Sequence, residues 1–107
     1  MPYVITVFDR EDREHLRAAN SAAHYAYLEE NQKIILLRGG FKNEASGGFF
    51  GGMLILDVPT KEAAAEFISK DPYAKAGMTK EMRIERYEPA YCAPAASWSK
   101  PAEGRGG

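Results

Sequence analysis

The chain has 107 residues, and its fourteen Lys and Arg against fifteen Asp and Glu give a formal net charge of −1. This length fits one domain with a modest core but is too short for two. The nearly balanced charge gives no electrostatic reason for binding nucleic acid or an anionic membrane surface. No apolar run is long enough to span a bilayer. We therefore expect no nucleic-acid partner and no membrane partner.

Cys92 is the single cysteine, so an internal disulfide is excluded and a cytoplasmic location is the natural expectation. The first residues, Met1-Pro2-Tyr3, are typical of the start of a strand and not of a signal peptide. His15 and His24 are the only histidines, and Cys92 lies far from both in sequence. This spacing gives no compact set of metal ligands, so we expect no metal and no other cofactor.

The first predicted element is a strand over residues 3–8, which are β-branched and aromatic with apolar side chains on both faces. Residues 13–31 then follow a helical pattern, but Asn20-Ser21 places two good capping residues in its middle. One interpretation is a continuous helix. The other, which we favour, is a short charged turn through Arg17 followed by a helix over residues 22–31 that Ser21 caps. In that second interpretation His24 lies in the first helical turn.

The remaining pattern predicts two strands, a helix and a last strand. A buried strand over residues 34–37 ends at Arg38-Gly39-Gly40, a polar loop covers residues 42–48, and a third strand covers residues 49–58. The paired glycines Gly51-Gly52 in this third strand indicate a close approach of backbone or ligand, or a bulge. Thr60 is a candidate N-cap for a second helix, and residues 82–87 alternate as a strand does.

The predicted order is therefore βαββαβ, which indicates an α+β, ferredoxin-like antiparallel sheet with its helices on one face. With right-handed crossovers, the first two strands end where the first helix begins and the second helix ends. We therefore expect one end of the sheet to gather a set of polar and glycine residues, namely Asp9, Arg17, His24, Arg38, Gly51, Gly52 and Asp71.

His24 and Asp71 are the candidates for proton transfer at this end. Imidazole titrates near neutral pH, and a carboxylate can fix its tautomer and raise its basicity. Asp71 also has a structural interpretation, because Asp-Pro is a common helix start with Asp as N-cap and Pro72 at the first helical position. Both roles can coexist, with Pro72 as a rigid support for the pair. His15 lies among charged residues and is expected to be solvated.

The other candidates concern the substrate. Arg17 could stabilise a developing oxyanion, with Asp9 to orient it, and Arg38 is a rival for the same role. Each of these also has a solvated-surface interpretation. Gly52 could approach the substrate. Tyr73 and Phe50 could line a pocket for a planar ligand, although packing is the simpler role for both.

Two stretches also carry a family resemblance. His24 followed by Tyr27-Leu28, together with the run Asp71-Pro72-Tyr73-Ala74-Lys75-Ala76-Gly77, resembles the YciI-like (YCII-related) family over about residues 1–87. The chain departs from it at Ser21-Ala22, where the family often has Arg-Pro. The resemblance implies a ferredoxin-like domain that pairs into a dimeric α/β barrel, with a His–Asp dyad at a small-molecule pocket. It further implies a relation to a branch that removes chloride from chlorinated hydroxyquinols.

Together these observations predict a domain over residues 1–88 and a Pro/Ala/Gly-rich C-terminal tail over residues 89–107, for which Tyr91 and Trp98 are candidate anchors on a neighbouring subunit or across the pocket. We expect a homodimer, because an apolar sheet face formed by Val4 or Ile5, Ile35, Leu54 or Ile55, and Ile84 needs a cover. The function hypothesis is a cofactor-independent enzyme, a dehydrochlorinase-like lyase or an isomerase, in which His24 and Asp71 abstract a proton from a small hydroxylated aromatic substrate. The alternative is a non-catalytic ligand-binding or assembly module of the same fold.

Overall fold

The computed structural model describes residues 2–94 of the chain. Its strands are β1 (Pro2–Asp9), β2 (Ile35–Lys42), β3 (Phe49–Asp57) and β4 (Thr79–Arg86), and its helices are α1 (Glu14–Glu30), α2 (Lys61–Ser69) and the single-turn α3 (Pro72–Lys75). Short 3-10 turns cover Glu11–Arg13 and Gln32–Ile34. Trp98 lies outside the described residues.

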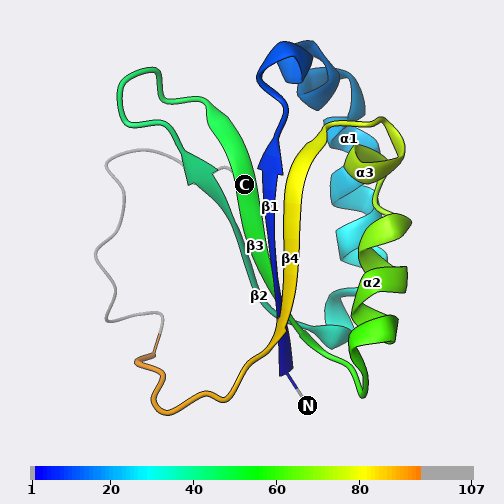
Figure 1. Ribbon diagram of the computed structural model, residues 1–107, viewed down its shortest axis with the longest axis vertical. Helices are drawn as coiled ribbons and strands as arrows, with labels where there is room; N and C mark the ends of the chain where they lie inside the picture. Colours follow the sequence, from blue (N-terminus) through cyan, green and yellow to red (C-terminus); the bar gives the residue numbers. More distant parts are fainter. Residues whose placement is uncertain (1, 95–107) are drawn as a thin grey trace.

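The four strands form one antiparallel sheet in the order β2-β3-β1-β4. All three helices pack on the same side of it (Figure 1). Since β1 and β2 both pair antiparallel with β3, they run in the same direction and finish at the same end of the sheet. The predicted α+β, ferredoxin-like architecture is confirmed, with α3 as an added turn between α2 and β4.

Helix α1 is continuous, so the interpretation that Ser21 caps a second helix is wrong. Asn20 Nδ2 donates to the Leu16 carbonyl at 2.8 Å, and Ser21 Oγ donates to the Ala18 carbonyl at 3.2 Å. These two polar side chains are satisfied by the preceding turn of their own helix and do not need to cap a new one. His24 therefore lies in the middle of α1 and not in a first turn.

Strand β2 is longer than predicted, because it runs through Arg38-Gly39-Gly40 to Lys42 instead of ending there. Pairing with β3 explains the extension, since Arg38, Gly39 and Gly40 lie opposite Leu54, Met53 and Gly52. The ladder hydrogen bonds hold these residues in the strand despite the low strand propensity of glycine. A Cβ on Gly51 would collide with the Val7 carbonyl oxygen, so close backbone approach is what requires the glycine there.

The core lies between the sheet and the helices. The buried apolar residues are Ile5, Leu28, Leu54, Leu56, Val58, Ala64, Phe67, Ile68 and Ile84. Thr60 caps α2 as predicted, because its side chain accepts from the Ala63 N–H. Helix α1 is joined to α2 through Tyr27, whose hydroxyl donates to the Phe67 carbonyl at 2.7 Å.

The sheet face away from the helices carries an aromatic cluster formed by Phe8, Phe41 and Phe50. The ring centroids of Phe8 and Phe41 are 5.4 Å apart, and those of Phe41 and Phe50 are 6.0 Å apart. Side chains alternate between the two faces along each strand, so Val4 and Ile55 also lie on this open face. They pair with each other next to the Ile5–Leu54 pair, which is buried on the helix side. Ile35 and Ile84, which the sequence suggested for this open face, pack on the helix side instead.

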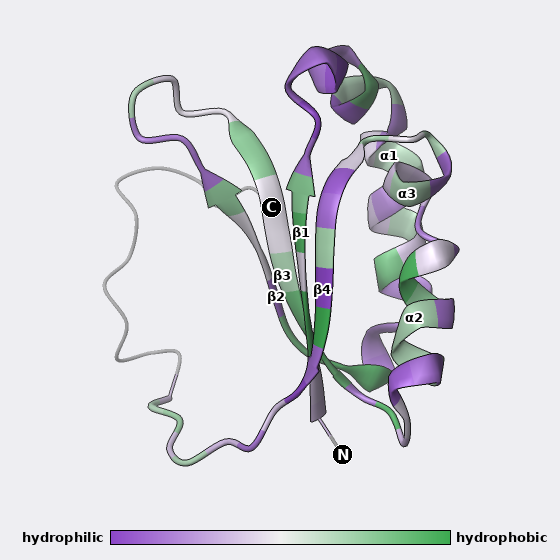
Figure 2. Ribbon diagram, viewed as in Figure 1, coloured by the Kyte–Doolittle hydropathy of each residue, from purple (hydrophilic) through white to green (hydrophobic). Residues whose placement is uncertain are grey.

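Hydropathy follows this layering. Figure 2 shows β1 and β3 as largely hydrophobic ribbons and β4, at the sheet edge, as alternating hydrophobic and hydrophilic segments.

Beyond β4 the chain continues through Tyr91, which is 83% exposed in the single subunit. No helix within residues 2–94 has the length and apolar character needed to cross a bilayer.

Candidate active site

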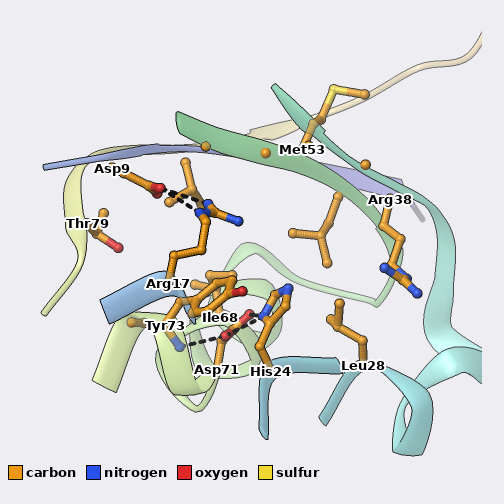
Figure 3. A pocket seen from close by; sticks show the side chains of 17 residues that line it. Asp9, Arg17, His24, Leu28, Arg38, Met53, Ile68, Asp71, Tyr73 and Thr79 are labelled. Carbon is orange, nitrogen blue, oxygen red and sulfur yellow. Dashed lines mark hydrogen bonds and ion pairs between the residues drawn. The ribbon is translucent and has the colours of Figure 1, made fainter. Parts of the chain in front are cut away.

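His24 and Asp71, 47 residues apart in sequence, form a buried polar contact between α1 and the start of α3. His24 Nδ1 lies 2.9 Å from Asp71 Oδ1 and 3.1 Å from Oδ2. The two residues are only 8% and 3% exposed. In the neutral imidazole, a carboxylate that accepts from Nδ1–H makes Nε2 the accepting nitrogen. Figure 3 shows this second nitrogen facing the adjacent cavity.

Local sequence explains the position of Asp71. The residue follows the end of α2 and is the N-cap of α3, with Pro72 at the first helical position. The same oxygen that contacts His24 accepts from the Tyr73 N–H at 2.9 Å. The capping role and the contact with imidazole therefore coexist, and the rigid turn at Pro72 fixes the carboxylate relative to α1.

Tyr73 is stacked between His24 and Arg17. Its ring lies 3.9 Å from the imidazole, centroid to centroid, with 17° between the ring planes. The Arg17 guanidinium carbon lies 4.8 Å from the same tyrosine ring. Asp9 Oδ2 accepts from Arg17 Nε at 3.1 Å and from Nη2 at 2.8 Å. A continuous row of contacts thus leads from Asp9 through Arg17, Tyr73 and His24 to Asp71 (Figure 3).

Burial sets the protonation of this tyrosine. Removal from water raises the pKa of the Tyr73 phenol above its ordinary value of 10.0, whereas the Arg17 charge opposes the shift. Tyr25 and the carboxylates Asp71 and Asp9 add to the increase. At neutral pH Tyr73 is therefore a neutral ring, suited to stacking against imidazole and guanidinium.

A cavity of about 50 Å³ lies against the His24–Asp71 pair. On the helix side it is bounded by His24, Leu28, Ile68 and Tyr73, and on the sheet side by the backbone of two glycine pairs, Gly39-Gly40 and Gly51-Gly52. This space holds roughly three to five water molecules. An open groove of about 1160 Å³ adjoins it, and Asp9, Arg17 and Tyr73 line both.

The predicted site residues fall into two groups. Asp9, Arg17, His24, Arg38, Gly52, Asp71 and Tyr73 all line the inner cavity. Phe50 does not line it: the residue is exposed, joins the aromatic cluster of the open sheet face and borders the outer groove. Pro72 follows Asp71 at the start of α3 and does not line the cavity.

Sequence reasoning missed several lining residues. Leu28, Ile68 and Thr79 bound the cavity, and Tyr25 stands edge-on to His24 with centroids 5.1 Å apart. Tyr25 directly follows His24 in the chain and could have been considered on that ground. Leu28 could have been found too, because residues four apart share a helix face. Within residues 2–94, no three His, Cys, Asp or Glu side chains gather as a metal site would require.

Comparison with solved structures finds a dehydrochlorinase with a similar fold. The 5-chloro-2-hydroxyhydroquinone dehydrochlorinase TftG from Burkholderia phenoliruptrix AC1100, in complex with 2,5-dihydroxybenzoquinone, is 29% identical with a TM-score of 0.79. The match covers 84% of this chain and 96% of that one.

A protein named as an antibiotic biosynthesis monooxygenase from Bacteriodes thetaiotaomicron VPI-5482 shares the fold, with a TM-score of 0.53 and 11% identity over 85% of this chain and 90% of that one. A comparison with curated proteins found no match. The YCII-related domain matches residues 1–88. With its antiparallel α+β sheet and this match over most of its length, the chain belongs to the YCII-related domain family.

Proposed function

We propose that this protein is an enzyme that removes a proton from a hydroxyl group of a small, planar, oxygenated ring. The reaction is an isomerisation, or the elimination of a leaving group such as chloride. His24 is the general base, Asp71 orients it, and Arg17 binds the oxyanion that forms. The observation that carries the proposal is the buried His24–Asp71 contact, with the second imidazole nitrogen turned to a cavity.

The arrangement supports this chemistry in three ways. The Asp71 carboxylate holds the imidazole in the tautomer that can accept a proton and stabilises the imidazolium that results. Stacking on Tyr73 fixes the plane of the ring. A purely structural histidine would instead be sealed by apolar neighbours, whereas His24 borders open space together with a guanidinium.

In the proposed reaction, His24 carries one proton from oxygen to carbon. The hydroxyl proton passes to His24 Nε2, and the O–H electron pair becomes an oxyanion beside Arg17. The oxyanion collapses to a carbonyl as the imidazolium returns the proton to a ring carbon, which completes an isomerisation. When that carbon carries a halogen, halide leaves as a second hydroxyl group loses its proton, and the net change is loss of HX. These steps call only on groups of the protein itself.

Similarity to TftG supports elimination over other proton transfers. That protein is a dehydrochlorinase of a chlorinated hydroxyhydroquinone, and the two chains share a fold over most of their lengths. We accordingly propose a halogenated or unsubstituted hydroxyhydroquinone as the class of substrate to test first. The family name alone does not select this reaction.

We also propose that the working form is a homodimer. The aromatic cluster of Phe8, Phe41 and Phe50 lies on a sheet face that no helix of the described chain covers. Packing this face against the same face of a second subunit would bury it, as in a dimeric α/β barrel.

The test measures turnover of chlorinated and unchlorinated hydroxyhydroquinones. The readouts are chloride release and exchange of ring hydrogen for deuterium. His24→Gln is the variant of choice, because glutamine fills much of the buried volume and can still bind Asp71. It should lower kcat on the order of 10²–10⁴, the usual range for general acid–base catalysis. His15→Gln, which changes an exposed histidine outside the site, is the matched control.

The alternative of a non-catalytic ligand-binding module predicts a different result. In that case these compounds bind to the wild-type protein, but neither chloride nor deuterium exchange is detected. Equal turnover by His24→Gln and the His15→Gln control would also refute the proposed role of His24.

A further inference from the structure

The inner cavity is a slot with a guanidinium group at each end. Figure 3 shows Arg17 rising from α1 at one end and Arg38 descending from β2 at the other, with the His24 ring between them. Both arginines line the cavity. The sequence offered them as rivals for one anion-binding role, but the structure places both along the same space.

Glycine backbone forms the wall of the slot opposite His24. Gly40 and Gly52 are cross-strand partners in β2 and β3, and neither carries a side chain toward the helices. A Cβ on Gly52 would lie 2.7 Å from the Gly39 carbonyl oxygen, so the backbones are too close for any larger residue. Peptide groups on one side and an imidazole on the other leave a space shaped for a ring lying flat.

The two arginines are held by different means. Asp9 and the Tyr73 ring fix Arg17, so its remaining donors have a defined direction. Arg38 lies near the Tyr25 ring, with its guanidinium carbon 5.8 Å from the centroid. A guanidinium presents planar N–H donors that suit an oxyanion, and its charge persists at any physiological pH.

We infer that the slot selects a six-membered ring with oxygen substituents at opposite ends, one bound by Arg17 and the other by Arg38, so that Arg38 determines specificity for this substitution pattern. The inference rests on the proposed function only in using the same cavity. It concerns binding and does not require that His24 act as a base.

Opposite placement matters because the two guanidinium groups lie on different sides of the His24 ring (Figure 3), so we expect each to bind its own oxygen. A ring with oxygens on adjacent carbons would satisfy Arg17 or Arg38 and leave the other beside an apolar edge. Loss of one charge-assisted contact from a ligand with both oxygens should weaken binding on the order of 10–100-fold.

The experiment measures equilibrium binding by calorimetry in the His24→Gln background, where turnover is suppressed. The probe is 2,5-dihydroxybenzoquinone, compared with 1,4-dihydroxybenzene and 1,2-dihydroxybenzene. Arg38→Gln and Arg17→Gln should each weaken binding of the quinone by the stated factor. Arg83→Gln removes an exposed arginine on β4, outside the cavity, and should leave binding unchanged.

Three further results test the specificity. The 1,4-isomer should bind more tightly than the 1,2-isomer, and Arg38→Gln should remove most of this preference. Arg38→Lys, which keeps the charge but not the planar donors, should show more of the preference than Arg38→Gln does. Circular dichroism checks that each variant is folded.

Failure of this inference is distinguishable from failure of the proposed function. Unchanged quinone binding in Arg38→Gln overturns the inference, whatever the turnover. Loss of binding in Arg38→Gln without any turnover by the wild-type protein overturns the catalytic proposal and leaves the specificity inference standing.

Discussion

At the scale of single residues, Asp71 carries two tasks on one carboxylate, because it caps α3 through the Tyr73 N–H and holds the His24 ring. Asp71→Asn separates these tasks. The amide oxygen can still accept from the Tyr73 N–H, but the negative charge that stabilises an imidazolium is gone. We expect kcat to fall on the order of 10²–10⁴, with KM changing little.

The same substitution should lower the free energy of unfolding by about 1–3 kcal/mol, since a buried charge-assisted hydrogen bond is lost. Steady-state kinetics and urea denaturation on one preparation measure both effects. A variant that loses stability but keeps its kcat would show that the Asp71–His24 contact supports the fold and not catalysis.

Two tyrosines give the molecule a dependence on alkaline pH. Burial raises the pKa of the Tyr27 phenol above 10.0, with Asp71, Glu66 and Glu30 adding to the shift, and burial also raises that of Tyr73. Above pH 10 the unfolded chain therefore loses these protons before the folded one does. Stability from this source is complete below pH 10 and is lost as the pH rises through the folded-state values.

Denaturation at pH 9 and pH 11 measures this loss. Tyr27→Phe should reduce the difference in unfolding free energy between the two pH values, whereas Tyr91→Phe, at an exposed position, should not. An equal pH dependence in Tyr27→Phe and the wild-type protein would contradict this account. Tyr27→Phe also loses the bond to the Phe67 carbonyl, so only the change with pH is diagnostic.

At the scale of elements, the continuous helix α1 and the capped helix α2 give opposite expectations for two hydroxyl residues. Thr60 accepts from the Ala63 N–H, and Thr60→Ala should cost about 0.5–2 kcal/mol of stability, as the loss of an N-cap does. Ser21 only donates to a carbonyl within its own helix, and Ser21→Ala should change stability by less than about 0.5 kcal/mol. A large loss in Ser21→Ala would mean that a cap does form at this residue in solution.

Sequence patterns predicted the element order and the meeting of distant residues at one end of the sheet. Strand periodicity, the cap at Thr60 and the Asp-Pro start of α3 are local signals, and right-handed crossovers then determine which ends coincide. Local signals misled at Asn20-Ser21, because hydrogen bonds to the preceding helical turn are as available to these side chains as capping is.

Other features depend on contacts between elements and have no local signal. The stack of Tyr73 between Arg17 and His24 depends on the distance between α1 and α3, which packing sets. The passage of β2 through Gly39-Gly40 depends on pairing with β3. The sequence placed Arg17 and Arg38 at the same end of the sheet, but where each side chain lies along the cavity depends on this packing as well.

At the scale of the whole molecule, the open sheet face predicts self-association. Light scattering should give twice the mass of the chain. Phe41→Glu places a charge in the aromatic cluster and should produce monomers, because the charge would have to be buried between the two sheets. Ala26→Glu, on the exposed surface of α1, is the control and should remain dimeric.

Circular dichroism of Phe41→Glu separates dissociation from unfolding. If the folded wild-type protein remains monomeric at high concentration, the proposed dimer is wrong. Monomeric Phe41→Glu with intact secondary structure would place the interface on the aromatic cluster.

The cap of α3 makes one backbone amide a reporter of the site. The Tyr73 N–H and the His24 ring both contact Oδ1 of Asp71, so a change of charge or distance on one side alters the hydrogen bond on the other. The amide resonance of Tyr73 should therefore shift when a ligand in the cavity moves the imidazole. Nuclear magnetic resonance of this one signal would report on the His24–Asp71 contact in solution without turnover of a substrate.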